Sequence, residues 1–111
     1  RMFRINDWIV ALSHVSAYQA SAARALVDLG ADVAAVAGQK NETIEVSLRA
    51  TREFNSHSGV HLGKDIAKPL GEYLHGMGGG HSTAAGANGV GDVEVGLKRC
   101  LALLKEKLVN H

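Results

Sequence analysis

The segment Gly76–Gly86 reads GMGGGHSTAAG and places five of the thirteen glycines of the chain around one histidine. Three consecutive glycines favour neither a helix nor a strand, because glycine loses more backbone freedom on ordering than any other residue. Such a run suits a backbone that turns through positive φ or lets a ligand approach closely. Adjacent N–H groups with no Cβ atoms beside them can hold a phosphate, especially where a helix begins directly behind them.

Two interpretations of this segment are open. In the first it is an anion-binding loop, to which His81 adds a donor that carries charge near neutral pH. Ser82 or Thr83 then caps a short helix that Gly86 ends. In the second it is a tight connection packed against a sheet. The segment matches neither the P-loop, because no Gly-Lys-Ser/Thr follows, nor the dinucleotide fingerprint, because its glycines are adjacent.

Length and composition predict an ordinary globular domain. The chain has 111 residues, 46% of them hydrophobic and 21% charged, which suits one domain with a modest core. A formal net charge of +1 excludes a global basic field, so any site for a polyanion is local. The single cysteine, Cys100, predicts a buried thiol and a cytoplasmic protein, and no apolar run is long enough to span a membrane. We expect residues 1–7 to be a linker remnant and residues 8–111 to form the domain.

The first third of the chain predicts a β-α-β unit. Trp8–His14 is a continuous apolar run typical of a buried strand. Ser16 and Gln19 have the spacing of a capping box, and the helix behind them is expected to end at Leu29. A second apolar strand is expected at Asp32–Gly38. Because a helix connects the two strands, they should be parallel with a right-handed crossover.

Thr43–Ala50 alternates between apolar and polar residues, as a half-buried strand does. It should form an antiparallel hairpin with the strand before it, because the connection is short and polar. The apolar face carries Ile44, Val46 and Leu48, and the polar face carries Glu45, Ser47 and Arg49.

The second half of the chain predicts fewer regular elements. Thr51–Gly59 reads as an irregular polar segment, and His61–His75 as a helix that Pro69 kinks or divides in two. Ala87–Val90 is expected to add a short edge strand. Asp92 should cap a C-terminal helix whose buried stripe is Val93, Leu97, Leu101, Leu104 and Leu108. The expected fold is therefore α/β (α+β), with a mixed sheet of four to five strands and flanking helices.

Arg49 is the second candidate binding residue. A lone arginine on a polar strand face is by default solvated. If it lies beside the glycine segment, its guanidinium and the N–H groups form a phosphate clamp. Phe54 is the candidate for base stacking. His57 and His61 lie four residues apart but lack a third ligand, so we predict no metal site and no catalytic residue in this chain.

Three motifs together resemble a known family. Residues 47–51 (SLRAT), residues 78–81 (GGGH) and residues 84–86 (AAG) are similar to the C-terminal DHH-associated domain of DHH phosphoesterases, in their RecJ-like exonuclease and oligoribonuclease branch. The resemblance covers most of the chain. It implies a mixed sheet with flanking helices that faces a catalytic domain across a cleft.

The resemblance implies that this chain is the substrate-binding half of such an enzyme. Arg49 would contact the substrate phosphate, His81 would approach it from the same side, and Ser47 would lie beside them. The implied phosphate cradle is Gly78, Gly79 and Gly80. The Asp-His-His motif is absent from the 111 residues, so catalysis and its divalent metal, usually manganese, would belong to a missing DHH domain. The implied partners are that domain and single-stranded DNA, short RNA or a small nucleotide; a homo-oligomer is left open and no membrane is expected.

The sequence also departs from the family pattern. Many members have serine directly after the strand arginine, whereas this chain has Ala50 followed by Thr51. This departure leaves substrate length and sequence preference open, though not the phosphate site itself. Two alternatives to the leading interpretation also stay open. One is a nucleic-acid-binding domain like the C-terminal domain of alanyl-tRNA synthetase. The other is a non-enzymatic interaction domain that pairs an exposed strand edge with a partner.

Overall fold

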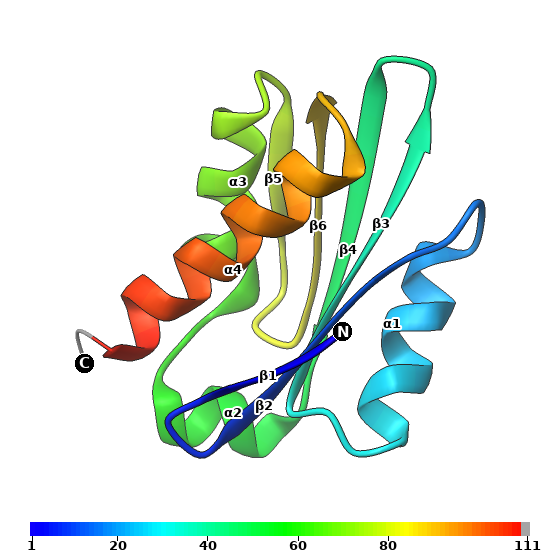
Figure 1. The fold of residues 1–111 in the computed structure, drawn as a ribbon. Helices are drawn as coiled ribbons and strands as arrows, with labels where there is room; N and C mark the ends of the chain where they lie inside the picture. The colour runs from blue at the N-terminus through cyan, green and yellow to red at the C-terminus, as the bar shows by residue number, and fades with distance from the viewer. Residues whose placement is uncertain (110–111) are drawn as a thin grey trace.

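A six-stranded mixed β-sheet with the strand order β1-β2-β3-β4-β6-β5 forms the middle layer of the structure (Figure 1). The computed structural model describes residues 1–109, so the last two residues of the predicted domain lie outside the described part. The strands are β1 (Met2–Ile5), β2 (Trp8–His14), β3 (Val33–Lys40), β4 (Thr43–Ala50), β5 (Met77–Gly80) and β6 (Ala84–Val90). The helices are α1 (Gln19–Asp28), α2 (Arg52–Ser58), the π-helical η1 (Leu62–Ala67), α3 (Lys68–Tyr73) and α4 (Val93–Val109). The predicted fold class is confirmed, with more strands than expected.

The β-α-β unit and the hairpin are confirmed. β2 and β3 pair in parallel, with Val10 opposite Val33, and α1 connects them. β3 and β4 pair antiparallel from Val33–Ala50 at one end to Lys40–Thr43 at the other. The carboxylate of Asp32 accepts a hydrogen bond from the Ile9 N–H at 2.7 Å, which ties the start of β3 to β2.

The expected linker at residues 1–7 is largely a strand. Met2–Ile5 pairs antiparallel with β2, and Asn6 turns the chain between them with a φ of 54°. Asparagine tolerates this left-handed conformation better than most residues, because its short polar side chain bonds locally. Ile5 is buried, so the hairpin adds to the core.

The predicted capping box before α1 is wrong. The N-cap residue is Tyr18, in the left-handed conformation, and no side chain caps the helix. The side chain of Gln19 lies over Gly38 of β3, where a Cβ atom would overlap it. Gln19 therefore packs helix against sheet and is not used in a capping box with Ser16.

The predicted irregular segment after β4 is the helix α2. The Thr51 hydroxyl accepts a hydrogen bond from the Phe54 N–H at 3.0 Å, and Gly59 ends the helix with a φ of 76°. Phe54 is buried and packs edge-to-face on Trp8, with ring centroids 5.1 Å apart. Its predicted role in base stacking is therefore wrong. The following helical region is divided into η1 and α3, with α3 beginning at Lys68. Of the two outcomes expected from Pro69, a kink or a division, the division is observed.

The glycine-rich segment is a β-hairpin. β5 and β6 pair antiparallel, and the His81 N–H donates to the Ala84 carbonyl at 2.8 Å across the connection. The helix expected after His81 is absent from the described residues, because Ala84–Val90 instead pairs with β4 along its whole length. β6 is thus an interior strand, longer than the predicted edge strand, and β5 lies at the edge.

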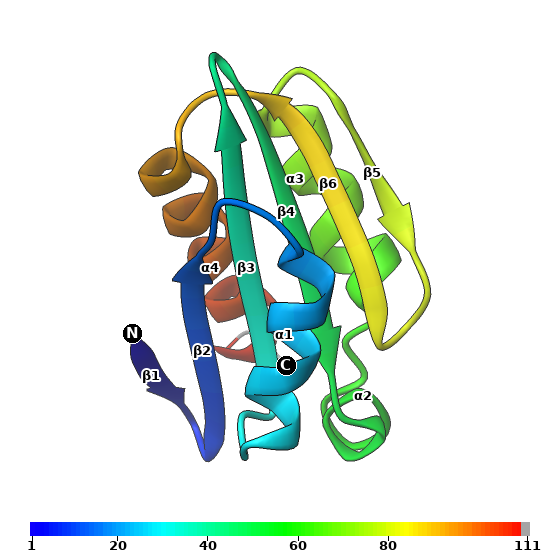
Figure 2. The same cartoon turned by 90° about the vertical axis from the view of Figure 1, so that its right-hand side faces the viewer.

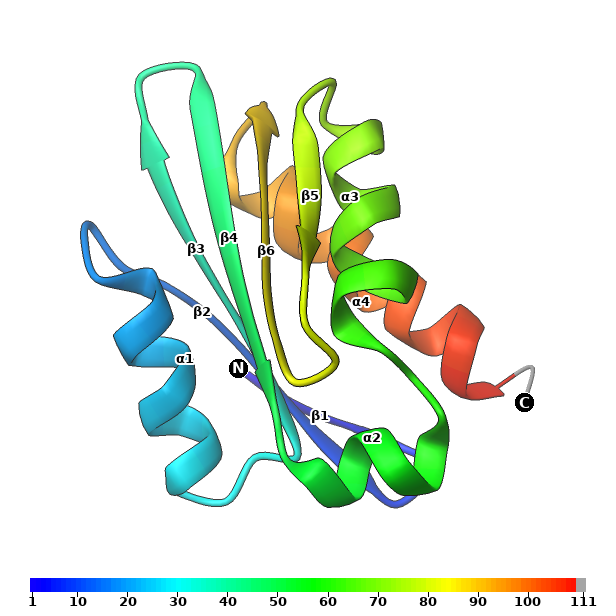
Figure 3. The ribbon, with the colours of Figure 1, turned by 180° about the vertical axis from the view of Figure 1, so that it is seen from behind.

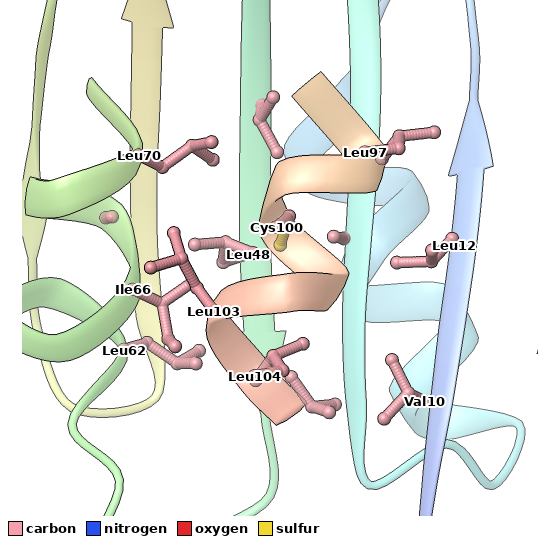
Figure 4. Packing of buried hydrophobic residues seen from close by; sticks show 14 of the residues in the cluster. Val10, Leu12, Leu48, Leu62, Ile66, Leu70, Leu97, Cys100, Leu103 and Leu104 are labelled. Atoms are coloured by element: carbon pink, nitrogen blue, oxygen red, sulfur yellow. The ribbon is translucent and has the colours of Figure 1, made fainter. Parts of the chain in front are cut away.

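The core divides between the two faces of the sheet. The larger cluster lies between the sheet and α4, η1 and α3 (Figure 4) and includes Leu48, Leu62, Ile66, Leu70, Leu97, Cys100, Leu103 and Leu104. The smaller cluster lies under α1 and is mostly alanine. Asp92 caps α4 as predicted, accepting from the Val95 N–H at 2.9 Å. Within residues 1–109, no helix has the length and hydropathy to cross a lipid bilayer.

The helices leave part of one sheet face uncovered. α3 and α4 lie behind the sheet in the view of Figure 2, whereas α1 lies in front of β3 and β4 and contacts both strands. Seen from behind, α1 is on one side of the sheet and α3 and α4 are on the other (Figure 3). On the side of α1, the strands β6 and β5 therefore carry no helix in the described part of the chain, and α1 borders them along β4.

Candidate functional site on the uncovered sheet face

We call the side of β4, β6 and β5 that faces away from α3 and α4 the open face; α1 borders it along β4, and β6 and β5 carry none of the described helices there. Alternate residues of β4 belong to it, because Ile44 points the other way, toward Gly96 of α4. Strand pairing then defines three rows across the open face. The arginine row is Arg49, Ala84 and His81; the glycine row is Ser47, Gly86 and Gly79; the glutamate row is Glu45, Asn88 and Met77.

The arginine row brings together the two charged candidates from the sequence. Arg49 is half-buried and pairs with Ala84, which receives the hydrogen bond from His81 on its other side. The backbones of Arg49 and His81 are thus two strand spacings apart, about 10 Å, with Ala84 between them. A guanidinium and an imidazole that extend toward each other over this alanine can contact one anion.

The polar side chains of these rows are accessible. In the part of the chain that the structure describes, no side-chain nitrogen or oxygen is buried without a hydrogen-bond partner. The hydrogen bonds found there engage the side chains of neither Arg49, His81 nor Ser47. These groups therefore have donors available to a ligand.

The consecutive glycines of β5 face opposite sides of the sheet. A Cβ at Gly79 would meet nothing within 4 Å, and one at Gly86 would meet only the Val46 carbonyl at 3.3 Å. A Cβ at Gly78 would instead overlap the Ala67 carbonyl, and Gly80 packs against Gly63 of η1. Gly79 and Gly86 therefore form a flat floor on the open face.

Gly78 and Gly80 have a packing role. Gly78 lets the Ala67 carbonyl of η1 approach the hairpin on the covered face, whereas Gly80 adopts a φ of 135° next to the turn, where a Cβ would overlap Ala84 and Ala85. The phosphate-cradling role that the resemblance implies for Gly78, Gly79 and Gly80 remains a prediction. Their geometry adds a separate reason for glycine at two of the three positions.

The other candidate groups have structural explanations. Burial raises the pKa of the Cys100 thiol from 9.0 to about 12, so it is neutral near pH 7 and packs as an apolar residue. The His61 Nδ1 accepts a hydrogen bond from the Lys64 N–H at 3.0 Å and so caps η1. No group of three or more metal-binding side chains occurs among residues 1–109. A divalent metal therefore has no fitting ligand set in the described part of the chain.

Asn88 and Met77 of the open face were not predicted as site residues from the sequence. Glu45 was placed on the polar face of its strand, but its neighbours depend on how β4, β6 and β5 pair. Glycine and alanine leave almost no hydrophobic alternation in the hairpin, so its register was not readable from the sequence. The exposed methionine beside three glycines was the available signal.

The fold and the comparisons define the class of domain. The architecture is that of the C-Ala domain of alanyl-tRNA synthetase from Aquifex aeolicus, with a TM-score of 0.70 over 97% of both chains at 19% identity. The DHHA1 domain family model matches residues 10–110, and the chain belongs to this family. This confirms the resemblance to the DHH-associated domain.

Two further proteins are similar to the chain. An uncharacterized protein of Methanocaldococcus jannaschii, MJ0988, is 44% identical over 81 residues, which cover 71% of this chain. The matched region spans 24% of the length of MJ0988. The pGpG-specific phosphodiesterase PggH of Vibrio cholerae matches 73% of this chain and 25% of its own, at 17% identity and a TM-score of 0.45.

Proposed function

We propose that this chain is the substrate-binding domain of a DHH-family metal-dependent phosphoesterase and that Arg49 and His81 bind a phosphate of a nucleic acid or nucleotide. The observation that carries the proposal is the arginine row, in which strand pairing brings these two residues together across a single alanine on the open face. Membership of the DHHA1 family supports it.

The chemistry of the row suits a phosphate oxyanion. A guanidinium offers planar paired donors that match two phosphate oxygens, and an imidazole N–H adds a third donor. The Ser47 hydroxyl lies one row further along β4 and can donate to a phosphate oxygen or to the adjoining sugar. These donors neutralise and orient the substrate, which is the contribution of a binding domain to catalysis.

Hydrolysis itself belongs, in this proposal, to a DHH catalytic domain of the same protein. In that domain a divalent metal would activate the attacking water, and we expect this metal to be manganese. In this proposal the residues of the present chain supply neither ligands for that metal nor a catalytic residue. Their role is to hold the substrate phosphate in place across the interdomain cleft.

The proposed substrate is the phosphorylated end of a nucleic-acid strand or a small nucleotide. The formal net charge of +1 provides no extended basic surface for a long polyanion. Single-stranded DNA, short RNA and mononucleotides all present a terminal phosphate that fits one arginine and one histidine.

Calorimetric titration with a 5′-phosphorylated dinucleotide and its dephosphorylated form tests this proposal. Arg49→Ala should weaken binding of the phosphorylated form by roughly ten- to a hundredfold, since a hydrogen bond to a charged group is worth about 1.5–3 kcal/mol. Arg99→Ala is the matched control, because Arg99 lies on α4 over the ring of Tyr73. Equal affinities for the two ligand forms, or an Arg49→Ala variant that binds like the parent, would favour an interaction domain without a phosphate site.

A further inference from the structure

The glutamate row gives the open face a second polar end. Glu45 and Asn88 are directly opposite each other on β4 and β6, and Met77 follows on β5. All three side chains are exposed, and Met77 retains 77% of its accessible surface. The hydrogen bonds among residues 1–109 leave the carboxylate of Glu45 and the amide of Asn88 available. An acceptor-only group thus lies beside a group that both donates and accepts.

The three rows are evenly spaced along the strands. Successive rows are two residues apart, which is about 7 Å in an antiparallel sheet. A phosphate bound at the arginine row therefore has the glycine row one step away and the glutamate row two steps away. A nucleoside 5′-phosphate has the same order of parts: phosphate, sugar, and a base whose polar edge points away from the phosphate.

The glycine row has the flat surface that a planar ring needs for stacking. Gly79 and Gly86 project no side chain into the open face, so a ring can lie directly on the backbone of β5 and β6. The thioether of Met77 borders this floor and makes favourable contacts with aromatic ring edges. The floor is thus flat, uncharged and bounded by polarizable sulfur.

We propose that the open face selects an amino-bearing purine, adenine, on the nucleotide whose phosphate Arg49 and His81 hold. The base lies over Gly79 and Gly86. The Glu45 carboxylate accepts a hydrogen bond from the exocyclic amino group, and the Asn88 amide donates to a neighbouring ring nitrogen. This inference rests on the proposed function, because the phosphate fixes where the base reaches.

The Glu45 carboxylate distinguishes an amino group on the base from a carbonyl oxygen. An ionised carboxylate has no proton to donate, so it requires a donor on the base. Replacing the amino group of adenine by the carbonyl oxygen of hypoxanthine places two acceptors against each other. The deaminated nucleotide should therefore be rejected although its size and phosphate are unchanged.

Three ligands and two variants test the inference on the 111-residue chain by calorimetric titration: adenosine 5′-phosphate, inosine 5′-phosphate and ribose 5-phosphate. Adenosine 5′-phosphate should bind about tenfold more tightly than inosine 5′-phosphate or ribose 5-phosphate. This ratio lies within the discrimination that one correct base contact provides. Glu45→Gln should reduce its advantage over inosine 5′-phosphate to about twofold or less, because the amide also donates. Glu72→Gln, an exposed carboxylate on α3, should preserve the tenfold ratio.

The outcomes separate the two proposals. Equal binding of all three ligands, with loss of each in Arg49→Ala, would overturn the adenine selection and leave the phosphate site standing. An unchanged ratio in Glu45→Gln, at an unchanged melting temperature, would also overturn it. Failure of every ligand to bind the parent would remove the phosphate site and the selection together.

Discussion

At the scale of single residues, the glycines of β5 show how one motif meets two requirements. Gly78 faces the helix layer, where the Ala67 carbonyl leaves no room for a side chain. Gly79 faces the open side, where a side chain would meet no neighbour. Adjacent residues on a strand point to opposite faces. A run of glycines therefore allows close packing on one face of the sheet and ligand approach on the other.

Alanine substitutions at these two positions should therefore differ. Gly78→Ala should lower the free energy of unfolding by about 1–3 kcal/mol, as overpacking against a fixed backbone does. Gly79→Ala should change it by no more than about 1 kcal/mol, because its φ is not positive and its surroundings are open. Urea denaturation of both variants measures the difference. Equal losses would show that the hairpin does not lie against η1 as described.

Cys100 gives a residue-scale prediction in pH. Its pKa is 9.0 in the ordinary state and about 12 when buried, so the unfolded chain loses this proton first as pH rises. The contribution of the neutral thiol to stability is fully present below pH 9 and is lost as pH rises toward 12, at up to about 1.4 kcal/mol per pH unit.

The measurement is unfolding in urea at pH 8 and pH 10 for the parent and Cys100→Ala. The parent should lose more stability than the variant between the two pH values. A parent and variant with identical pH dependence would mean that the thiol is already ionised or exposed in the folded protein.

At the scale of elements, the sequence predicted those with side-chain periodicity and missed those without it. The alternation in Thr43–Ala50 and the apolar run in Trp8–His14 gave both strands with their observed bounds. The segment Gly76–Gly86 has too few side chains to show a period, so its hairpin was taken for a loop and a helix. α2 was missed although Thr51 and Gly59 were readable as its caps, because its polar composition suggested a loop.

The cap of α4 gives a prediction at this scale. Asp92→Ala should lower the free energy of unfolding by about 1 kcal/mol, because the Val95 N–H loses its acceptor and the helix N-terminus loses a favourable charge. Asp92→Asn should retain most of the stability, since asparagine also caps well. Thermal unfolding of the two variants compares them. An alanine variant as stable as the asparagine variant would contradict the capping role.

At the scale of the whole molecule, the placement of the helices decides where a ligand can bind. α1 packs on β3 and β4, and the opposite face is filled by α4, η1 and α3, so within residues 1–109 β6 and β5 present a helix-free surface beside α1 (Figure 2). The sequence supplied Arg49, Ser47 and His81 as candidates, but their adjacency depends on the pairing of β4 with β6, a long-range contact that no local pattern encodes.

A site with few charged contacts predicts a weak dependence of binding on salt. With one or two phosphate contacts, the logarithm of the association constant for a 5′-phosphorylated dinucleotide should fall with a slope of about −0.7 to −1.4 against the logarithm of salt concentration. The affinity should then drop about three- to sevenfold between 50 and 200 mM salt. Titrations at four salt concentrations measure the slope. A slope steeper than about −3 would require an extended basic surface.

Phosphate binding at the arginine row of the open face can be tested residue by residue. The experiment is a ¹H–¹⁵N NMR titration of the 111-residue chain with a 5′-phosphorylated dinucleotide, because each backbone amide reports separately. We expect saturable shifts concentrated at Arg49, His81, Gly79 and Gly86, and their loss in Arg49→Ala. Shifts confined to α4 and the outer strands β1 and β2, or no shifts at millimolar ligand, would contradict it.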